Sequence, residues 1–526
     1  MFDVAIVGLG PSGAVAAGLL GLKGLKVYVC DAAHEVYDKP RAIALDHEIL
    51  RVFQQLGLVE AMAPYMEAFT NSEFYGVDGD LIKCMSTVAP PYPLAYPPSL
   101  VFSQPPVERL IRQRLCELPC VQVALGQQLI QITQDATAAT LTLRSDTGES
   151  STVQARYVIA CDGASSTVRG HLGIEFEDLG FDEPWLVVDV LVNDKGLAKL
   201  PQVSVQFCEP QRPCTYVIGP KNHRRWEISI NPGEDPKQVA SPEGTWALLS
   251  RWLQPDEATL WRQASYRFHA LLAKDWRCGR IFLAGDAAHQ QPPFLGQGMC
   301  QGIRDVSNLT WKLADVLQQR ASDTLLDSYG LERKAHVKEL TMRIKGIGQL
   351  VGQRDVALAR QRDQHLLAQC GGVVQPMPRQ NVQPALQGGC LAADGSTAVG
   401  TLFPQAWIKQ GRDAVRMDQA LGCGWRLMLA ADAGIGLESM AAAQQRGLAL
   451  RIVRLNSPDC QETEGVLAQW FVSQRCQAVL VRPDHYVYAT LNTQAELAKH
   501  LTALTRSFYP LAEAALNSTP HAGEAK

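Results

Sequence analysis

The chain has 526 residues, of which 46% are hydrophobic and 19% are charged, and its formal net charge is −4. This length exceeds what one hydrophobic core serves and favours about two to three domains of ordinary globular composition. The slightly acidic balance, without a dense basic cluster, argues against nucleic-acid and anionic-membrane partners, because no cationic excess is there to neutralise phosphates.

The cysteines and the apolar start of the chain bear on its location. None of the 14 cysteines forms a C-x-x-C pair; this pattern predicts a reduced, intracellular protein without a zinc or iron–sulfur site. The apolar stretch 2–30 lacks a basic leading region and is interrupted by Lys23 and Lys26. We therefore expect neither a signal peptide nor a membrane span, and a cytoplasmic location.

A glycine fingerprint follows the first predicted strand (residues 2–7). Gly8, Gly10 and Gly13 fit G-x-G-x-x-G and precede a helix of small residues, while a second strand over 25–31 ends in Asp31. Glycines allow the tight turn, the approach of a pyrophosphate and close helix–strand packing, and the acid can accept ribose hydroxyls. A tight turn without a ligand is the alternative, and this motif alone does not separate FAD from NAD.

Two later strands end in a glycine–aspartate pair. Asp162 and Gly163 follow the apolar residues 158–161, and Gly285 and Asp286 follow 281–284. Each aspartate could simply cap the following helix. A second set of contacts with the same dinucleotide explains both aspartate motifs. Such contacts would favour a permanently bound flavin over a nicotinamide cofactor that binds transiently.

These motifs resemble the class A flavoprotein aromatic hydroxylases, which are single-component FAD monooxygenases. The likeness covers residues 1 to about 345 and includes the Asp-Gly motif ending in Arg169 and the segment 285–298 followed by Asp305. Within the family, 40–46, 185–190 and 209–213 resemble the 3-(3-hydroxyphenyl)propionate hydroxylase-like branch. Leu295 and Cys300 depart from the common pattern of the loop beside the flavin.

The resemblance implies an α/β fold in several segments. A Rossmann-like FAD-binding domain (1–75, 99–180 and 270–345) carries an inserted β-sheet substrate domain (76–98 and 181–269), as in p-hydroxybenzoate hydroxylase. A helix and linker (346–394) precede a C-terminal α/β domain (395–515), whose residues 479–487 resemble a thioredoxin-like domain. Because that domain lacks C-x-x-C, we expect it to support dimerisation or scaffolding rather than redox chemistry.

The resemblance also implies which residues hold FAD. Asp286 is expected to bind the ribityl chain, and the loop up to Gly298 is expected to direct backbone N–H groups at the flavin ring. Arg41 and Gln104 match cofactor-contacting positions, although Arg41 could be a surface charge. The full expected set is Gly8, Gly10, Ser12, Gly13, Asp31, Arg41, Gln104, Asp162, Gly285, Asp286, Pro293, Gly296, Gln297, Gly298 and Met299.

At the substrate end the expected residues are His47, Arg212 and Tyr216. Arg212 could hold a substrate carboxylate and His47 could relay a proton, although a structural histidine is the alternative.

The implied reaction is hydroxylation of a phenolic aromatic compound, such as a 3-hydroxyphenylpropionate-like acid, through a C4a-hydroperoxyflavin. It uses O2 and NADH or NADPH as co-substrates. A polyketide or other polycyclic aromatic hydroxylase is the first alternative. A flavin halogenase, a prenyl reductase and a non-enzymatic GDP-dissociation-inhibitor-like escort share the fold.

Overall fold

The computed structural model describes residues 1–438, 440, 443–444 and 447–509. The chain forms two compact units. The N-terminal unit comprises residues 1–307 and 336–384, and the C-terminal unit comprises residues 308–335 and the chain from 385 onward.

The first sheet of the N-terminal unit is built on the glycine fingerprint. Its central strand β1 pairs in parallel with β2 and β11, and β11 pairs in parallel with β18. The strands are apolar because helices and the rest of the unit bury them. The sheet has the order β17-β18-β11-β1-β2-β8, with β9 and β10 attached through β11. Its strands are β1 (Phe2–Val7), β2 (Val27–Asp31), β8 (Val121–Leu125), β9 (Gln127–Gln134), β10 (Ala139–Ser145), β11 (Ser150–Ala160), β17 (Arg277–Cys278) and β18 (Ile281–Leu283).

Helix α1 (Pro11–Gly21) follows β1 directly and is buried along most of its length. Its small side chains let it approach its neighbours closely. A Cβ on Gly18 would lie 2.8 Å from a methyl carbon of Leu56, and one on Gly21 would lie 2.6 Å from a methyl carbon of Val121. Small residues in this helix therefore serve packing as well as the turn before it.

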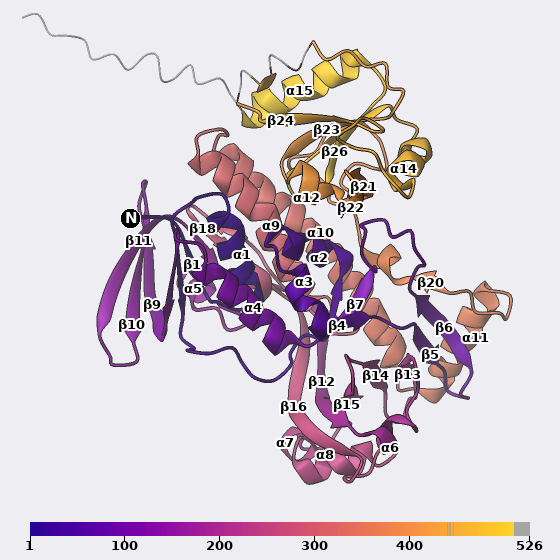
Figure 1. The fold of residues 1–526 in the computed structure, drawn as a ribbon. Helices are drawn as coiled ribbons and strands as arrows, with labels where there is room; N and C mark the ends of the chain where they lie inside the picture. The colour runs from indigo at the N-terminus through magenta and orange to yellow at the C-terminus, as the bar shows by residue number, and fades with distance from the viewer. Residues whose placement is uncertain (439, 441–442, 445–446, 510–526) are drawn as a thin grey trace, which may run out of the picture. The chain divides into compact units, whose positions relative to one another are not determined.

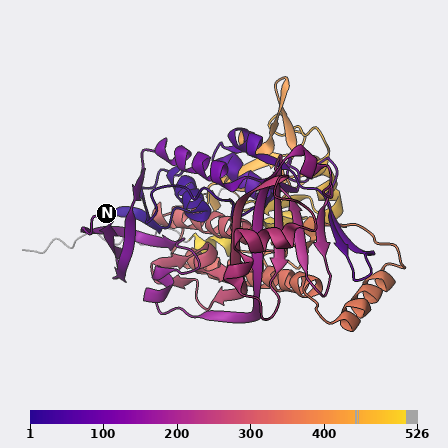
Figure 2. The ribbon, with the colours of Figure 1, turned by 90° about the horizontal axis from the view of Figure 1, so that it is seen from below.

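The second sheet is a mostly antiparallel, nine-stranded sheet with the order β19-β16-β12-β15-β14-β13-β5-β6-β20. Two long strands, β12 and β16, run side by side along it (Figures 1 and 2). Its strands are β5 (Ser72–Tyr75), β6 (Leu81–Ser86), β12 (Phe176–Val192), β13 (Ser204–Phe207), β14 (Cys214–Ile218), β15 (His223–Ser229), β16 (Ala258–Ala273), β19 (His289–Gln290) and β20 (Met377–Pro378).

Short elements and helices complete the N-terminal unit. A small sheet joins β3, β7 and β4. Helices α9 and α10 each run from one unit's residues into the other's. These elements are β3 (Ala44–Asp46), α2 (His47–Gln55), α3 (Val59–Met62), η1 (Ala63–Tyr65), β4 (Met66–Ala68), β7 (Ser99–Phe102), α4 (Gln104–Cys116), α5 (Thr167–His171), α6 (Asp194–Leu197), α7 (Pro236–Val239), α8 (Pro242–Leu249), η2 (Gly285–Ala287), α9 (Gly298–Leu317), α10 (Thr324–Val351), α11 (Val356–Gln369) and η3 (Arg379–Val382).

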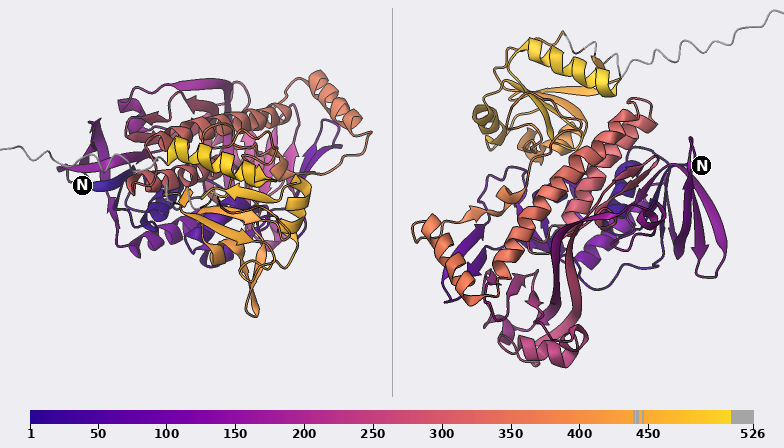
Figure 3. Two further views of the ribbon diagram at one scale, coloured as in Figure 1. Left: turned by 90° about the horizontal axis from the view of Figure 1, so that it is seen from above. Right: turned by 180° about the vertical axis from the view of Figure 1, so that it is seen from behind.

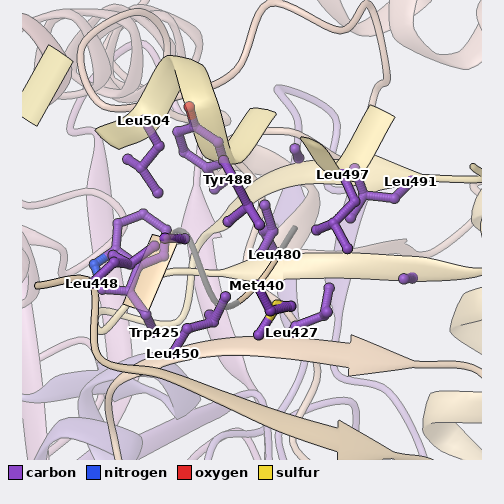
Figure 4. Packing of buried hydrophobic residues seen from close by; sticks show 14 of the residues in the cluster. Trp425, Leu427, Met440, Leu448, Leu450, Leu480, Tyr488, Leu491, Leu497 and Leu504 are labelled. Carbon is purple, nitrogen blue, oxygen red and sulfur yellow. The ribbon is translucent and has the colours of Figure 1, made fainter. Parts of the chain in front are cut away.

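The C-terminal unit contains a four-stranded sheet of order β24-β23-β25-β26. Strand β23 pairs in parallel with β24 and antiparallel with β25. Helix α15 lies across the sheet (Figure 3), and its leucines join a buried core with Trp425 and Tyr488 (Figure 4). The elements are β21 (Trp407–Gln410), β22 (Asp413–Arg416), α12 (Met417–Leu421), β23 (Trp425–Leu429), β24 (Leu450–Arg454), α14 (Val466–Gln474), β25 (Ala478–Val481), β26 (Val487–Leu491) and α15 (Gln494–Phe508).

A buried ionic cluster lies within the C-terminal unit. Glu332 accepts hydrogen bonds from Lys312 (2.9 Å), Asn308 (2.7 Å) and Arg482 (2.7 Å). Arg482 also binds Asp484 at 2.6 Å. The cluster thus links the helical residues 308–335 to the turn between β25 and β26. None of the helices in the described ranges has a stretch long and apolar enough to cross a membrane.

Candidate active site

A cavity of about 670 Å³ lies inside the N-terminal unit. One side is formed by residues at the carboxyl ends of β1, β2, β11 and β18, and the other by side chains of β13, β14 and β15. The carboxyl ends of parallel strands are where open α/β sheets bind ligands. Both aspartate motifs reach this cavity together with the glycine fingerprint, although they are far apart in the sequence.

The three fingerprint glycines have different structural roles. A Cβ on Gly8, whose φ is +96°, would lie 2.3 Å from the carbonyl oxygen of Cys161, and one on Gly13 would lie 1.9 Å from that of Gly8. A Cβ on Gly10 would meet nothing within 4 Å, and Gly10 lines the cavity. Gly8 and Gly13 therefore permit close backbone packing, whereas Gly10 leaves room for a ligand at the start of α1.

Asp31 ends β2 and lines the cavity. Its carboxylate accepts hydrogen bonds from the backbone N–H of Leu9 (2.6 Å) and that of Ala33 (2.7 Å). These bonds fix the acid beside the glycine turn, where it can meet ribose hydroxyls.

The two later aspartates differ from each other. Asp162 accepts from the Ser166 hydroxyl (2.6 Å) and the Val168 N–H (3.0 Å), so it supports the first turn of α5, whose N-cap is Ser166, and it also lines the cavity. Asp286 lines the cavity with its side chain exposed to it and accepts no hydrogen bond within the described residues. The surrounding protein raises the pKa of its carboxyl through desolvation, although Arg41 and His289 oppose this shift. Asp286 is therefore available to bind hydroxyl groups.

Gln104 fixes the loop that carries Arg41. Its side-chain oxygen accepts from the backbone N–H of Arg41 (3.1 Å) and that of Ala42 (2.6 Å). The Arg41 side chain is exposed, lines the cavity and lies over the Tyr37 ring at 4.9 Å.

The structure brings most of the expected cofactor residues to this cavity. Two of the expected residues, Gly13 and Gln297, do not line the cavity. Gly13 is taken up by helix–strand packing, and the Gln297 side chain accepts from Arg304 and Gln383, both at 2.9 Å. The lining members are Gly8, Gly10, Ser12, Asp31, Arg41, Gln104, Asp162, Gly285, Asp286, Pro293, Gly296, Gly298 and Met299.

His47 is not brought to the cavity. It begins α2 as a buried side chain, and desolvation lowers the pKa of its imidazole to about 4. Its ring is therefore neutral near pH 7 and away from the lining. The geometry supports the structural histidine, not the proton relay.

Arg212 and Tyr216 also lie away from the cavity lining. Arg212 forms a bidentate pair with Glu234 at 2.6 and 2.7 Å, which neutralises its charge. Tyr216 is fully buried on the opposite face of β14, beside Trp226, and donates to the Pro201 carbonyl at 3.3 Å. Because strand side chains alternate, Thr215 and Val217 face the cavity and Tyr216 does not. The assignment of both residues to the substrate end is therefore revised.

Other residues, which no sequence motif marked, line the substrate side of the cavity. Glu227 and Thr215 stand opposite each other on β15 and β14, and Gln206 stands opposite Thr215 on β13. A pattern that could have found them is the run Arg225, Glu227 and Ser229, where polar residues occupy every second position of a strand.

Arg379 is another missed residue, and it comes from the predicted linker. Its side chain is buried, lines the cavity, donates to the Leu295 carbonyl at 2.6 Å and lies 4.5 Å from the Phe69 ring centroid. No carboxylate pairs with it in the described part of the chain. Burial lowers the pKa of the guanidinium to about 10, so it stays charged at neutral pH. No local sequence pattern marks this position.

These features define a flavin-binding oxidoreductase fold. The open space at Gly10 and the Asp286 carboxyl, which accepts no hydrogen bond within the described residues, fit FAD, which the glycine fingerprint, Asp31 and Asp286 would hold. When bound, FAD supplies the redox chemistry, which the polypeptide itself lacks.

Comparisons with known proteins agree with this class. Residues 1–344 match the FAD binding domain family, and residues 400–507 match the HcaD C-terminal domain family. The chain is 35% identical over 520 residues to the probable NADH-specific resorcinol 4-hydroxylase of Rhodococcus jostii, covering 97% of this chain and 96% of the relative. It is 32% identical over 529 residues to the 3-(3-hydroxy-phenyl)propionate/3-hydroxycinnamic acid hydroxylase of Escherichia coli, covering 95% and 94%.

Among solved structures, the flavin-dependent monooxygenase PieE, in complex with FAD and substrate, matches with a TM-score of 0.81 at 20% identity, over 96% of this chain and 98% of that one. Aklavinone-11 hydroxylase matches with a TM-score of 0.77 at 21% identity, over 96% and 98%. At this level of identity the structural matches establish the fold. The chain belongs to the FAD binding domain family, as a class A FAD-dependent aromatic hydroxylase.

The sequence-based α/β fold, FAD as cofactor and the hydroxylase class are thus confirmed. The thioredoxin-like character of the C-terminal domain and the limits of the four predicted segments remain predictions. The predicted end of the last segment, at 515, lies outside the described residues.

Proposed function

We propose that this hydroxylase acts on a phenol that carries an anionic or polar group meta to its hydroxyl, with 3-hydroxyphenylpropionate-type acids as the first candidates. The observation that supports this substrate class is Arg379, a buried cation that lines the cavity without a carboxylate partner in the described ranges. A guanidinium in this state gains charge-assisted hydrogen bonds when it receives a carboxylate. The relative named for 3-(3-hydroxy-phenyl)propionate points the same way.

The overall reaction consumes NADH, a proton and O2. One oxygen atom enters the aromatic ring as a hydroxyl and the other leaves as water, while NADH is oxidised to NAD⁺. NADH rather than NADPH is proposed because the Rhodococcus relative is named NADH-specific. We also propose that the protein is located in the cytoplasm, where NADH is supplied, and that it forms a homodimer.

The polypeptide's part is to bind, orient and shield the substrate. Phe69 and Val217 form one apolar wall of the cavity. Pro293 and Phe294, which belong to the loop at 293–299, form another. Apolar walls exclude water from the reacting ring, and polar groups fix its orientation.

A resorcinol-type neutral phenol is the second candidate. The polar row of Glu227, Thr215 and Gln206 suits a substrate with hydroxyl groups only, and the Rhodococcus relative is named for resorcinol. Polycyclic substrates, as in aklavinone-11 hydroxylase, rest on the shared fold alone.

The test compares Arg379→Met with wild-type holoenzyme on 3-(3-hydroxyphenyl)propionate and on resorcinol, with NADH and O2 consumption and product as readouts. Loss of Arg379 should raise the KM for the acid at least tenfold, in line with ~1.5–3 kcal/mol for a hydrogen bond to a charged group. The KM for resorcinol should change much less.

Arg212→Met is the matched control, because its guanidinium is paired with Glu234 outside the cavity lining. It should leave both KM values unchanged. An equal rise for both substrates in Arg379→Met, or a rise for the acid in Arg212→Met, would contradict the anchor. Absence of phenol-stimulated NADH oxidation in wild type, across a panel of phenolic compounds, would contradict the function.

A further inference from the structure

Three neighbouring strands of the second sheet present a row of hydrogen-bonding side chains to the cavity. Glu227 of β15 pairs in register with Thr215 of β14, and Thr215 pairs with Gln206 of β13. All three residues are buried, and all three line the cavity. Directly opposite residues on adjacent strands have their Cβ atoms about 5 Å apart, so the row is continuous.

Hydrogen bonds orient two members of the row. The Thr215 hydroxyl donates to the Gln206 side-chain oxygen at 2.6 Å, which leaves the Thr215 oxygen free to accept and the Gln206 NH2 group free to donate. The Glu227 carboxyl accepts no hydrogen bond in the part of the chain that the structure describes. A buried polar group without a protein partner is costly unless a ligand or water supplies one.

The charged side chains near Glu227 form their ion pairs and hydrogen bonds with other residues. Arg225, two residues earlier on β15, binds Asp189 of β12 at 2.7 and 3.1 Å and donates to the Arg41 carbonyl at 2.8 Å. Arg262 of β16 lies 3.7 Å from Asp189 and donates to the Pro40 carbonyl. Thr215, which faces Glu227 from β14, carries no charge. Glu227 is therefore a cavity-facing carboxyl without an ion pair.

We propose that Glu227 is the catalytic base that accepts the proton of the substrate's phenolic hydroxyl, while Thr215 and Gln206 hold the resulting oxygen. This proposal rests on the proposed function, because it assumes that a phenol occupies the cavity. The phenolic O–H bond breaks, its electron pair stays on the oxygen, and the proton forms a bond to a Glu227 carboxylate oxygen. After the new hydroxyl is placed, Glu227 returns its proton to the ring oxygen, and the proton on the hydroxylated carbon is released to water, so that the ring becomes aromatic again and Glu227 is a carboxylate.

The protonation behaviour of Glu227 suits this role. Burial raises the pKa of its carboxyl to about 7, with Asp189 adding to the shift and Arg225 and Arg262 opposing it. Its pKa is therefore closer to that of a phenol than the pKa of an exposed glutamate is, and a closer match favours proton transfer. The carboxylate form that accepts the proton becomes populated as the pH rises through about 7.

The first measurement does not involve turnover. Oxidised holoenzyme, without NADH, is titrated with 3-nitrophenol, whose phenolate absorbs in the visible, across a pH series. In wild type the Glu227 carboxylate beside the bound phenol should oppose a second negative charge, so the phenol should ionise at a higher pH than in Glu227→Gln. In Glu227→Gln ionisation of the bound phenol should move to lower pH, because the neighbouring negative charge is gone, with FAD content unchanged.

The second measurement is the pH profile of kcat with the substrate that wild type hydroxylates. Glu227→Gln should lower kcat near pH 7 by roughly a hundredfold, the size typical of a lost general base, and should remove the acid limb of the profile. Glu227→Asp should retain the limb at a displaced pH. Glu183→Gln is the matched control, because Glu183 is a carboxyl of the same sheet that also has a raised pKa but is only half-buried and does not line the cavity.

An unchanged phenolate titration and pH profile in Glu227→Gln would overturn the proposal, as would the same loss in Glu183→Gln. If Glu227→Gln does not fold, an unchanged profile in Glu227→Asp overturns it instead. Failure of the proposed function is distinguishable, since wild-type enzyme would then oxidise no NADH in response to any phenol.

Discussion

At the residue scale, the ionisation of Glu227 affects the stability of the fold as well as the proposed proton transfer. A carboxyl that is 4% exposed and lacks a hydrogen-bond partner in the described chain is costly to ionise, and burial raises its pKa to about 7. The unfolded chain ionises the same group near its ordinary pKa of 4.5. The folded state therefore loses stability relative to the unfolded state as pH rises from about 4.5 to 7.

Glu227→Gln should remove this penalty. We expect the variant to gain up to about 3 kcal/mol of unfolding free energy over wild type at pH 8 and much less at pH 5, even as it loses activity. Thermal unfolding of both proteins at the two pH values measures the difference. Glu149→Gln, an exposed carboxyl, is the control and should show no pH-dependent gain. A gain of equal size at pH 5 and pH 8 would contradict the ionisation argument.

At the element scale, the strand–turn–helix unit of β1 and α1 separates packing from ligand binding. Gly13 lies where a Cβ would be 1.9 Å from the Gly8 carbonyl oxygen, and backbone cannot yield as a flexible side chain does. Gly10 has open space towards the cavity and a φ of −70°, which any residue adopts.

Alanine at these two positions should therefore act differently. Gly13→Ala should destabilise the protein by about 1–3 kcal/mol or more through overpacking, and FAD should be lost as a consequence. Gly10→Ala should keep the melting temperature of the FAD-free protein but weaken FAD binding, because its methyl group occupies the space of the approaching cofactor. Thermal unfolding of FAD-free protein and flavin absorbance after gel filtration measure the two effects. Full FAD retention in Gly10→Ala would show that the pyrophosphate does not approach this turn.

At the scale of the whole molecule, residues distant in sequence are held in one unit by the ionic cluster of Glu332, Lys312 and Arg482. Glu332 is fully buried, and the cations beside it lower the pKa of its carboxyl to about 2 despite desolvation. Such a group stabilises the fold above its unfolded pKa and loses that contribution as pH falls towards about 2.

Glu332→Gln should destabilise the C-terminal unit by about 3–5 kcal/mol at pH 7, since it leaves Lys312 without a buried counter-charge. The difference from wild type should shrink as pH is lowered below about 4.5, where protonation removes the same charge from the wild-type chain. Urea unfolding followed by tryptophan fluorescence reports it, because Trp311 and Trp425 lie in this core. Glu339→Gln, which removes a half-exposed partner of Arg343, should have little effect. A cost that does not vary with pH would indicate lost packing instead of lost charge.

The sequence by itself determined the nucleotide end of this site. Gly8, Asp31, Asp162 and Asp286 each lie at the end of an apolar strand or within three residues after it, so local chain geometry carries them to the carboxyl edge of one sheet. Side-chain contacts over long sequence distances add little to that placement. For this reason the glycine fingerprint and the two aspartate motifs together were sufficient to predict FAD, and their resemblance to a known family implied the hydroxylase class.

The substrate end was decided only by the tertiary structure. The face that each residue of β14 presents depends on how the sheet is covered, and that covering buried Tyr216 and turned Thr215 to the cavity. Arg212 was neutralised by Glu234, whose pairing depends on a turn 22 residues away. Arg379 reaches the same cavity from a segment whose composition predicts a linker. Charge pairing and burial depend on neighbours that are remote in sequence, so local patterns could not assign these roles.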